Sequence, residues 1–248
     1  MRFFCPQAST EQKIIELTDP HEIHHLRNVF RLKEKDQIRI FNARDEEFAA
    51  TIVAIKKNSI EIRPDYLLPP NPPKSTAIVL ACALPKRAKF EFIIEKCTEL
   101  GVDEIIPLKT RRTEVSVKED RREQKAERFR KIAVNAAKQC GRRDLPVIHP
   151  VTLFTKVLEA FDSDHLALIP CLSGSRQNIF RFFRDRPPSP VKKIVVLIGP
   201  EGDFTPEEVR LAVDSGCVPV SLGPTVLKVD TAAVSAVAFL NFFLNTNV

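Results

Sequence analysis

The stretch from Ile194 to Ala232 constrains the fold more than any other part of this 248-residue chain. It opens with the uninterrupted apolar run Ile194–Ile198, which is typical of a parallel strand buried on both faces. A turn at Gly199–Gly202 follows, then a helix whose start matches a capping box, with Thr205 as N-cap and Glu208 as its partner. A second short strand and a second glycine turn complete the stretch. The pattern predicts an open α/β sheet, and its glycine turns fall where such sheets bind ligands.

A proline-rich segment, Leu67–Pro73, predicts the boundary between two domains. It holds four prolines within five residues, which cannot continue a strand ladder and keep the chain extended. Before it, short β-type runs separated by polar turns, with one helix at 20–31, predict a small barrel over residues 1–70. After it, strands alternate with helices, so residues 74–248 are predicted to form a mostly parallel α/β domain.

Apolar runs and helical periodicity give the elements of this second domain. The helix at 89–100, for example, places Phe90, Ile93 and Ile94 on one face and ends at Gly101. The predicted strands are 76–82, 104–108, 165–169, 194–198 and 218–222. The predicted helices are 89–100, 123–140, 153–161, 179–184, one from 205 to a stop at Gly216, and 231–244 with Asp230 and Thr231 at its cap.

The positive charge of the chain is concentrated in one region. The net charge is +6, and the segment from Lys109 to Arg143 alone carries 13 basic and 5 acidic residues. A basic patch this local favours a polyanionic partner, with nucleic acid as the first candidate. The alternative is a solvated helix face that carries ion pairs between residues four apart.

Cysteines and hydropathy indicate a cytoplasmic protein without a membrane span. The six cysteines are dispersed, which fits reduced thiols better than a disulfide framework or a metal knuckle. The amino terminus shows no signal-peptide pattern, and the longest apolar tract, Ala232–Leu244, is shorter than the roughly 20 residues of a membrane span. No metal site is predicted, because His21, His24 and His25 have no identifiable further ligands.

Several common α/β functions lack their sequence fingerprints. No Gly-x-Gly-x-x-Gly follows a strand, no Gly-Lys-Ser/Thr phosphate loop is present, and no Gly-x-Ser-x-Gly elbow is present. The chain has only seven glycines, and four of them lie between Gly199 and Gly223. That concentration favours a ligand site, and the alternative is ordinary turn chemistry.

Four motifs, in order along the chain, resemble one known family. They resemble the bacterial 16S rRNA (uridine-N3) methyltransferases, which belong to the knotted SPOUT methyltransferases. The resemblance spans essentially the whole chain. It is carried by the segments 25–31, 92–102, 198–202, and 222–224 with Leu227, Thr231 and Ala232.

The resemblance implies a fold, a cofactor and an oligomeric state. It implies a PUA-like RNA-binding barrel at 1–70 and a SPOUT methyltransferase domain at 74–248 with a trefoil knot. It also implies a homodimer and S-adenosylmethionine held by the loops 171–173, 199–202 and 222–227. Glycines suit such loops, because backbone amides approach a ligand closely where no Cβ intervenes. The implied cofactor residues are Leu172, Ser173, Ile198, Gly199, Pro200, Glu201, Gly202, Leu222, Gly223, Val226, Leu227 and Thr231.

The implied reaction needs a base and a cation. N3 of uracil carries a proton that must be removed, and the anion that forms must be stabilised. Asp230, Glu201 and Lys228 are the charged residues nearest the expected pocket, although Asp230 could serve only as a helix cap and Glu201 only in a turn or interface ion pair. The implied partner is 16S rRNA or the small ribosomal subunit. The residues expected to contact its phosphates are Arg27, Arg31, Lys109, Arg111, Arg112, Arg142 and Arg143.

The chain departs from its family at several positions. Relatives usually carry Arg at positions 225 and 228, Glu at 230 and Gly at 203, where this chain has Thr225, Lys228, Asp230 and Asp203. They also commonly carry Gly where Lys35 stands here. Lys228 keeps a charge without the bidentate geometry of arginine. These changes leave open a non-catalytic RNA-binding or ribosome-assembly factor that retains the fold. A third reading, an α/β enzyme acting on a small nucleotide, lacks a phosphate loop.

Overall fold

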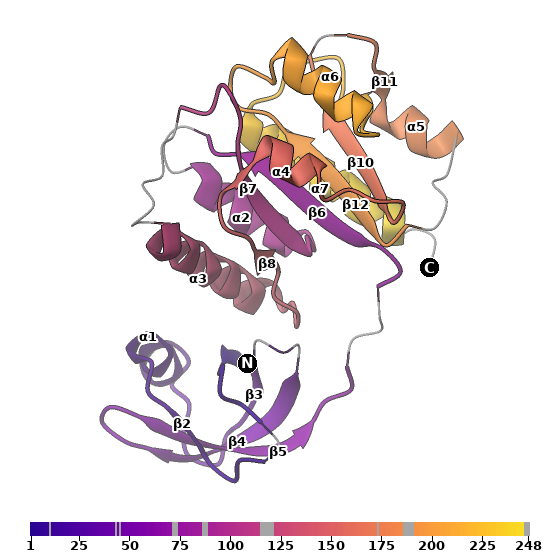
Figure 1. The fold of residues 1–248 in the computed structure, drawn as a ribbon. Helices are drawn as coiled ribbons and strands as arrows, with labels where there is room; N and C mark the ends of the chain where they lie inside the picture. The colour runs from indigo at the N-terminus through magenta and orange to yellow at the C-terminus, as the bar shows by residue number, and fades with distance from the viewer. Residues whose placement is uncertain are drawn as a thin grey trace. The chain divides into compact units, whose positions relative to one another are not determined.

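The computed structural model describes residues 1–9, 11–42, 44, 46–70, 74–85, 89–114, 122–172, 174–185 and 191–245. The chain forms two compact units, which Figure 1 traces from one terminus to the other. The first unit comprises residues 1–73 together with 137–145, and the second comprises residues 74–136 and 146–248. The segment 137–145 thus packs with the first unit, although its sequence continues a helix of the second.

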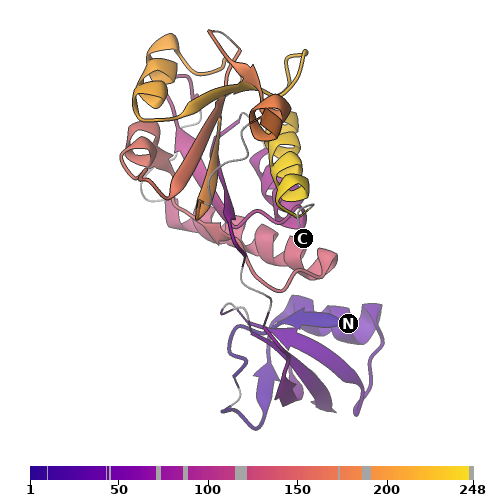
Figure 2. The same ribbon diagram turned by 90° about the vertical axis from the view of Figure 1, so that its right-hand side faces the viewer.

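The first unit is a curled five-stranded sheet, as the β-rich pattern predicts. Its strand order is β1-β3-β4-β5-β2, so β1 and β2 are edges and the sheet is a half-barrel instead of a closed barrel (Figure 2). Register shifts between β4 and β5 bend the ladder. The strands are β1 (Arg2–Phe4), β2 (Ile15–Leu17), β3 (Gln37–Phe41), β4 (Glu47–Ile55) and β5 (Ile60–Leu67).

One short helical segment belongs to this unit. The α-helix α1 (Pro20–His24) continues as a π-helical turn, η1 (His25–Val29), which is shorter than the helix expected at 20–31. Arg31 lies beyond the helix, with φ of +54°, so the right-handed conformation has already ended there. Leu26 is buried under the sheet's core, with Ile40 and Ile62 among the fully buried side chains around it.

The second unit is built on a parallel sheet of eight strands. Their order is β11-β13-β10-β12-β6-β7-β8, and β9 pairs with β7. Every strand pair is parallel, as the unbroken apolar runs predict. The strands are β6 (Ala77–Ala83), β7 (Glu104–Lys109), β8 (Val147–Ile148), β9 (Thr152–Leu153), β10 (His165–Pro170), β11 (Gln177–Asn178), β12 (Lys193–Ile198) and β13 (Val218–Ser221).

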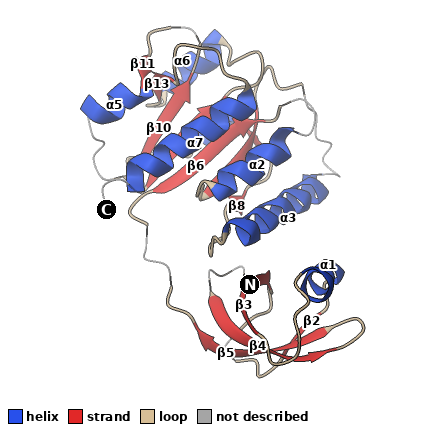
Figure 3. Cartoon of the chain, turned by 180° about the vertical axis from the view of Figure 1, so that it is seen from behind, coloured by secondary structure: helices blue, strands red, loops and turns tan. Residues whose placement is uncertain are grey.

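Helices cover both faces of this sheet. Figure 3 shows α2 and α7 lying side by side over one face, and Figure 1 shows α4 and α6 over the other. Residues of β6 alternate between the two hydrophobic layers, with Ile78 and Leu80 in one and Val79 and Ala81 in the other. The helices are α2 (Lys89–Glu99), α3 (Arg122–Cys140), α4 (Phe154–Leu158), α5 (Ile179–Asp185), α6 (Pro206–Asp214) and α7 (Val229–Asn245).

Local signals set several element ends. The capping box of α6 is present, with Thr205 as N-cap, Pro206 in the first turn and Glu208 as partner, and Gly216 follows the helix with φ of +88°. The cap predicted for the last helix was wrong. Helix α7 begins at Val229, so Asp230 lies inside the first turn instead of before it.

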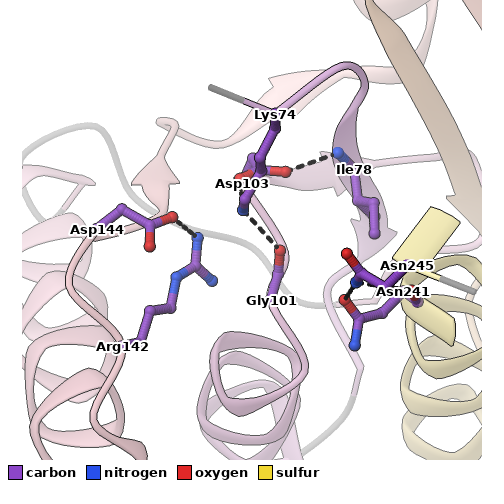
Figure 4. A network of polar contacts seen from close by, with 8 residues as sticks. All are labelled: Lys74, Ile78, Gly101, Asp103, Arg142, Asp144, Asn241 and Asn245. Atoms are coloured by element: carbon purple, nitrogen blue, oxygen red, sulfur yellow. Dashed lines mark hydrogen bonds and ion pairs between the residues drawn. The ribbon is translucent and has the colours of Figure 1, made fainter. Parts of the chain in front are cut away.

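Polar contacts close the amino-terminal ends of β6 and β7. The Asp103 carboxylate accepts a hydrogen bond from the Ile78 backbone N–H at 2.8 Å and forms an ion pair with Lys74, whose ammonium also reaches the Gly101 carbonyl (Figure 4). This edge of the sheet is therefore occupied by structural contacts.

Within the described ranges the structure contains neither a helix that could span a membrane nor a cluster of side chains that could bind a metal ion. None of their helices combines the length and apolar character that crossing a membrane requires. Within the same ranges, no cluster of histidine, cysteine and carboxylate side chains could hold a metal ion.

Candidate active site

A cavity of about 370 Å³ lies at the carboxyl ends of β13, β10 and β12, which are neighbours in the sheet. In open α/β sheets ligands bind at this edge, and the volume falls in the range of small-molecule sites. Three loops wall it. The lining residues are Lys89, Pro170, Cys171, Leu172, Arg176, Ile198, Gly199, Pro200, Glu201, Asp203, Val220, Ser221, Leu222, Gly223, Pro224, Thr225, Val226, Leu227, Lys228, Val229 and Ala232.

The loop after β12 depends on a glycine for its packing. A Cβ on Gly199 would lie 3.1 Å from Cδ2 of Phe204 and 3.2 Å from the Phe204 backbone nitrogen. The Phe204 ring is buried against Phe154, with 5.2 Å between ring centroids. Gly199 thus lets the loop turn directly over a fixed aromatic side chain, and its bare backbone faces the cavity.

Asp203 joins two of the loops. Its backbone is left-handed, with φ of +60°, and its N–H donates to the Pro200 carbonyl at 2.9 Å. Its carboxylate accepts a hydrogen bond from the Leu172 backbone N–H at 2.8 Å. On the same loop as Leu172, the Arg176 guanidinium donates to the Cys171 carbonyl at 2.9 Å. Burial, reinforced by the Asp203 charge, raises the pKa of the Cys171 thiol.

The third loop follows β13 and carries exposed apolar side chains. The Ser221 hydroxyl donates to the Gly223 carbonyl at 2.8 Å and so folds the turn, in which Gly223 has φ of +154°. Val226 is 74% exposed and Leu172, on the loop opposite, is 49% exposed. Apolar side chains left open around a cavity are suited to cover the flat face of a ligand.

Charged side chains gather at one end of the cavity. Lys89, in the first turn of α2, lines it together with Glu201 and Lys228. The Lys89 ammonium lies 3.9 Å from Oδ1 of Asp230, in the first turn of α7. That oxygen is buried and accepts no hydrogen bond from any described residue. The sequence singled out Asp230, Glu201 and Lys228, but it gave no signal for Lys89, which reaches the site only through the packing of α2 against α7.

Comparison with known proteins identifies the family. Residues 72–241 match the model of the RNA methyltransferase domain, and residues 17–65 match that of the RNA methyltransferase PUA domain. The chain belongs to the RNA methyltransferase family. It is 32% identical to the ribosomal RNA small subunit methyltransferase E of Rickettsia conorii, over 96% of this chain and 93% of the relative. It is 29% identical to the Bacillus subtilis protein of the same name, over 89% and 87% of the two chains.

Solved structures agree with this membership. A methyltransferase from Legionella pneumophila, solved in complex with the cofactor SAM, superposes with a TM-score of 0.83 at 32% identity and covers 96% of both chains. The ribosomal RNA small subunit methyltransferase E of Neisseria gonorrhoeae, solved bound to S-adenosyl methionine, gives a TM-score of 0.81 at 26% identity, over 96% of this chain and 95% of that one.

The structure brings most of the expected cofactor residues of this methyltransferase to one cavity. Two of them, Gly202 and Thr231, stand next to the lining without being part of it, and Ser173 lies outside the described residues. The expected residues that line the cavity are Leu172, Ile198, Gly199, Pro200, Glu201, Leu222, Gly223, Val226 and Leu227.

The basic loop after β7 is attached to the cavity wall. The Arg111 backbone N–H donates to the Glu208 carboxylate at 2.8 Å, and the Arg112 guanidinium donates to the Gly202 carbonyl. Lys109 is exposed at the end of β7. Of these three residues expected to contact RNA, Arg112 supports the turn at Gly199–Gly202, and the Arg111 backbone is fixed to α6, which follows that turn.

The remaining expected RNA contacts lie in the first unit. Arg27 donates to the Lys57 carbonyl at 2.9 Å and stays exposed, as does Arg31. The Arg142 guanidinium binds Asp144 at 2.6 Å and its side chain is only 8% exposed, and Arg143 binds Glu47 at 2.7 Å. These two arginines stabilise the fold locally, so we do not include them in the proposed RNA surface.

Part of the basic patch follows the alternative interpretation. On α3, Arg128 pairs with Glu91 at 2.6 Å and Arg130 pairs with Glu123 at 3.1 Å. Arg130 also pairs with Glu127, three residues before it, at 3.5 Å, as on a solvated helix face, whereas the Arg128–Glu91 pair joins α3 to α2. Residues 115–121 of the patch lie outside the described residues.

Proposed function

We propose that this RNA methyltransferase transfers the methyl group of S-adenosylmethionine to N3 of a uridine in 16S rRNA. The observation that carries the proposal is the three-loop cavity with a buried, unsatisfied Asp230 oxygen beside it. We infer the substrate, rRNA of the small subunit, from the names of the relatives. We infer the uridine and its N3 position from the motif resemblance.

The residues of the cavity fit S-adenosylmethionine. Leu222, Val226 and Leu227 offer apolar surface for the adenine ring, and Gly199 and Gly223 line the cavity without a Cβ that would hold a ligand away from the backbone. Glu201 and Asp203 offer negative charge to a ligand that carries a sulfonium and an ammonium group. When bound, the cofactor supplies an electrophilic methyl group, and the loops hold it in place.

The chain's own residues then act on the base. The Asp230 carboxylate, with an oxygen that accepts no hydrogen bond from the described residues, is the proposed acceptor of the N3 proton. Asp230 itself is not among the lining residues but follows the lining residue Val229, whereas Lys228 and Glu201 line the cavity and would orient the base and the cofactor. Holding the methyl group next to N3 contributes to the rate through orientation alone.

The RNA would be held by both units. Arg27 and Arg31 of the PUA-type unit and Lys109, Arg111 and Arg112 of the methyltransferase unit are the proposed phosphate contacts. We further propose a cytoplasmic homodimer and a knotted path for the last strands and α7, both on the strength of the family resemblance.

Two measurements test the function. Titration calorimetry should show that the purified protein binds S-adenosylmethionine. Nucleoside mass spectrometry should show that deletion of the gene removes N3-methyluridine from 16S rRNA, and that wild-type protein but not Asp230→Asn restores it. An unchanged mark in the deletion strain contradicts the proposed reaction. Absence of cofactor binding would favour a non-catalytic RNA-binding factor.

A further inference from the structure

Lys89 lies at a position in helix α2 where a positive charge is unfavourable. It lies in the first turn of α2, next to the positive end of the helix dipole, where a basic side chain is disfavoured. Its side chain is 38% exposed and lines the cavity beside Glu201 and Lys228. The neighbouring residues Phe90, Ile93 and Ile94 are buried and fix this turn against the core. A rigid helix thus presents an ammonium group to the cavity.

The contact of Lys89 with Asp230 is incomplete as an ion pair. The distance of 3.9 Å from Nζ to Oδ1 exceeds a hydrogen bond, and Oδ1 is buried without a hydrogen bond from any described residue. A pair that served only stability would be expected to close this gap, as Lys96 does on the same helix with Glu95 at 2.8 Å and Glu99 at 2.9 Å. At this distance the Lys89 ammonium is not hydrogen-bonded to the carboxylate, so its N–H groups remain able to donate to a ligand in the cavity that it lines.

We propose that Lys89 is a catalytic residue that stabilises the negative charge formed on the uracil when N3 is deprotonated. The inference rests on the proposed function. The N3–H bond breaks, its proton passes to the Asp230 carboxylate, and the negative charge left on N3 is shared with the two carbonyl oxygens of the uracil. The electron pair on N3 would then form the bond to the methyl carbon while the bond between this carbon and the cofactor sulfur breaks, and the sulfur would leave with the electron pair of that bond as a neutral thioether.

Conservation of charge explains why a lysine is suited to this place. Before proton transfer the Lys89 ammonium faces the Asp230 anion, and after transfer Asp230 is neutral while the negative charge lies on the base. The Lys89 ammonium therefore faces one negative charge before and after proton transfer, first on Asp230 and then on the base. Because helix packing fixes the position of the ammonium beforehand, the ammonium can stabilise the anion on the base with little reorganisation during the reaction.

The test compares Lys89→Gln and Lys89→Arg with a matched control, Lys96→Gln, on the same helix. Single-turnover methylation is measured on two RNAs that differ only in carrying uridine or 5-fluorouridine at the target. Fluorine makes N3–H more acidic, so the second RNA needs less help in losing its proton. Calorimetry with S-adenosylmethionine and RNA titration follow binding, and thermal melting follows folding.

We expect Lys89→Gln to bind cofactor and RNA within about threefold of wild type. Its rate should fall on the order of 100-fold on the uridine RNA, as for loss of one donor to a developing oxyanion. The loss on the 5-fluorouridine RNA should be at most about tenfold. Lys89→Arg should recover much of the rate, and Lys96→Gln should match wild type.

Equal losses on the two RNAs, or a loss explained by weaker cofactor binding, would overturn the role of Lys89 and leave the proposed function standing. Failure of the wild-type protein to form N3-methyluridine would instead overturn the proposed function, and the inference with it.

Discussion

At the scale of single residues, Asp203 combines a strained backbone conformation with a hydrogen bond to a residue far away in the sequence. A non-glycine residue at φ of +60° is conformationally disfavoured, and aspartate is among the few that tolerate it. In return the carboxylate fixes the Leu172 N–H and so joins two loops of the cavity. A glycine would relieve the strain and lose the bridge.

Asp203→Gly should change both cofactor affinity and stability. Asp203→Gly gains about 1 kcal/mol of backbone relief and loses a charge-assisted hydrogen bond of about 1.5–3 kcal/mol. We expect its Kd for S-adenosylmethionine to rise about three- to tenfold, measured by calorimetry, and its Tm to fall by a few degrees, as expected for a net loss of about 0.5–2 kcal/mol. Asp203→Asn keeps an acceptor and a tolerance for this backbone, so it should bind within about twofold of wild type. Equal affinities in the two variants would show that the bridge has no part in binding.

Gly199 and Gly202 form a matched pair for testing steric fit. A Cβ on Gly199 meets Phe204 at 3.1 Å, whereas one on Gly202 meets only Cδ of the Arg112 side chain at 3.4 Å. We expect Gly199→Ala to lower the free energy of unfolding by about 1–3 kcal/mol in urea titration, because overpacking displaces a buried ring. Gly202→Ala should stay within about 0.5 kcal/mol of wild type. If Gly202→Ala lost more stability than Gly199→Ala, the Phe204 ring would have to move aside at little cost in free energy.

At the scale of elements, Glu208 connects helix α6 to the basic loop. Its buried carboxylate accepts hydrogen bonds from the Thr205 N–H at 2.9 Å and from the Arg111 N–H at 2.8 Å. One side chain thus completes a helix cap and holds the loop that carries three proposed RNA contacts. The capping box was predictable from residue spacing, but the bond to Arg111 was not.

Replacing Glu208 should therefore cost more than an ordinary cap. Glu208→Ala removes the Glu208 half of the capping box and leaves two backbone donors without their acceptor, which we expect to lower the free energy of unfolding by about 2–4 kcal/mol. The neighbouring Glu207→Gln, at an exposed side chain, serves as the control and should change it by less than about 0.5 kcal/mol. Denaturant titration measures both, and equal costs would contradict a connecting role for Glu208.

At the scale of the whole molecule, the two ends of the parallel sheet have different tasks. The carboxyl ends carry the cavity, and the amino ends carry structural ion pairs. Glu104 at the start of β7 binds Lys193 at the start of β12 at 2.6 Å and His149 at 2.8 Å. These contacts, the hydrogen bond from His149 above all, lower the pKa of Glu104 to about 2.

Acid stability should reflect this lowered pKa. Because the pKa in the folded state lies below the ordinary value of 4.5, the stabilisation is complete above pH 4.5 and is lost as the pH falls towards about 2. Glu104→Gln should lower the free energy of unfolding at pH 7 by about 1–2 kcal/mol after allowance for solvent screening, and should flatten its pH dependence between these values. Cofactor affinity, set at the opposite edge, should not change. If the free energy of unfolding of Glu104→Gln changed with pH as steeply as that of wild type, Glu104 would not be the source of the pH dependence.

The sequence by itself determined what depends on neighbours along the chain. The parallel sheet follows from unbroken apolar runs, the start and end of α6 follow from Thr205, Glu208 and Gly216, and two of the three loops of the cavity follow from glycine turns after strands. These signals act over a few residues and are readable one segment at a time. The knotted path of the chain remains a prediction, since the motif resemblance alone supports it.

Only the tertiary structure decided which distant side chains meet. Lys89 and Asp230 are 141 positions apart and approach each other because α2 packs against α7, and Leu172 meets Asp203 because β10 and β12 are neighbours in the sheet. Arg142 looked like the other basic residues of its segment, yet the fold buries it against Asp144. Composition and spacing give the charge of a residue, whereas its partner, its burial and hence its chemistry depend on contacts that form only when the whole core has packed.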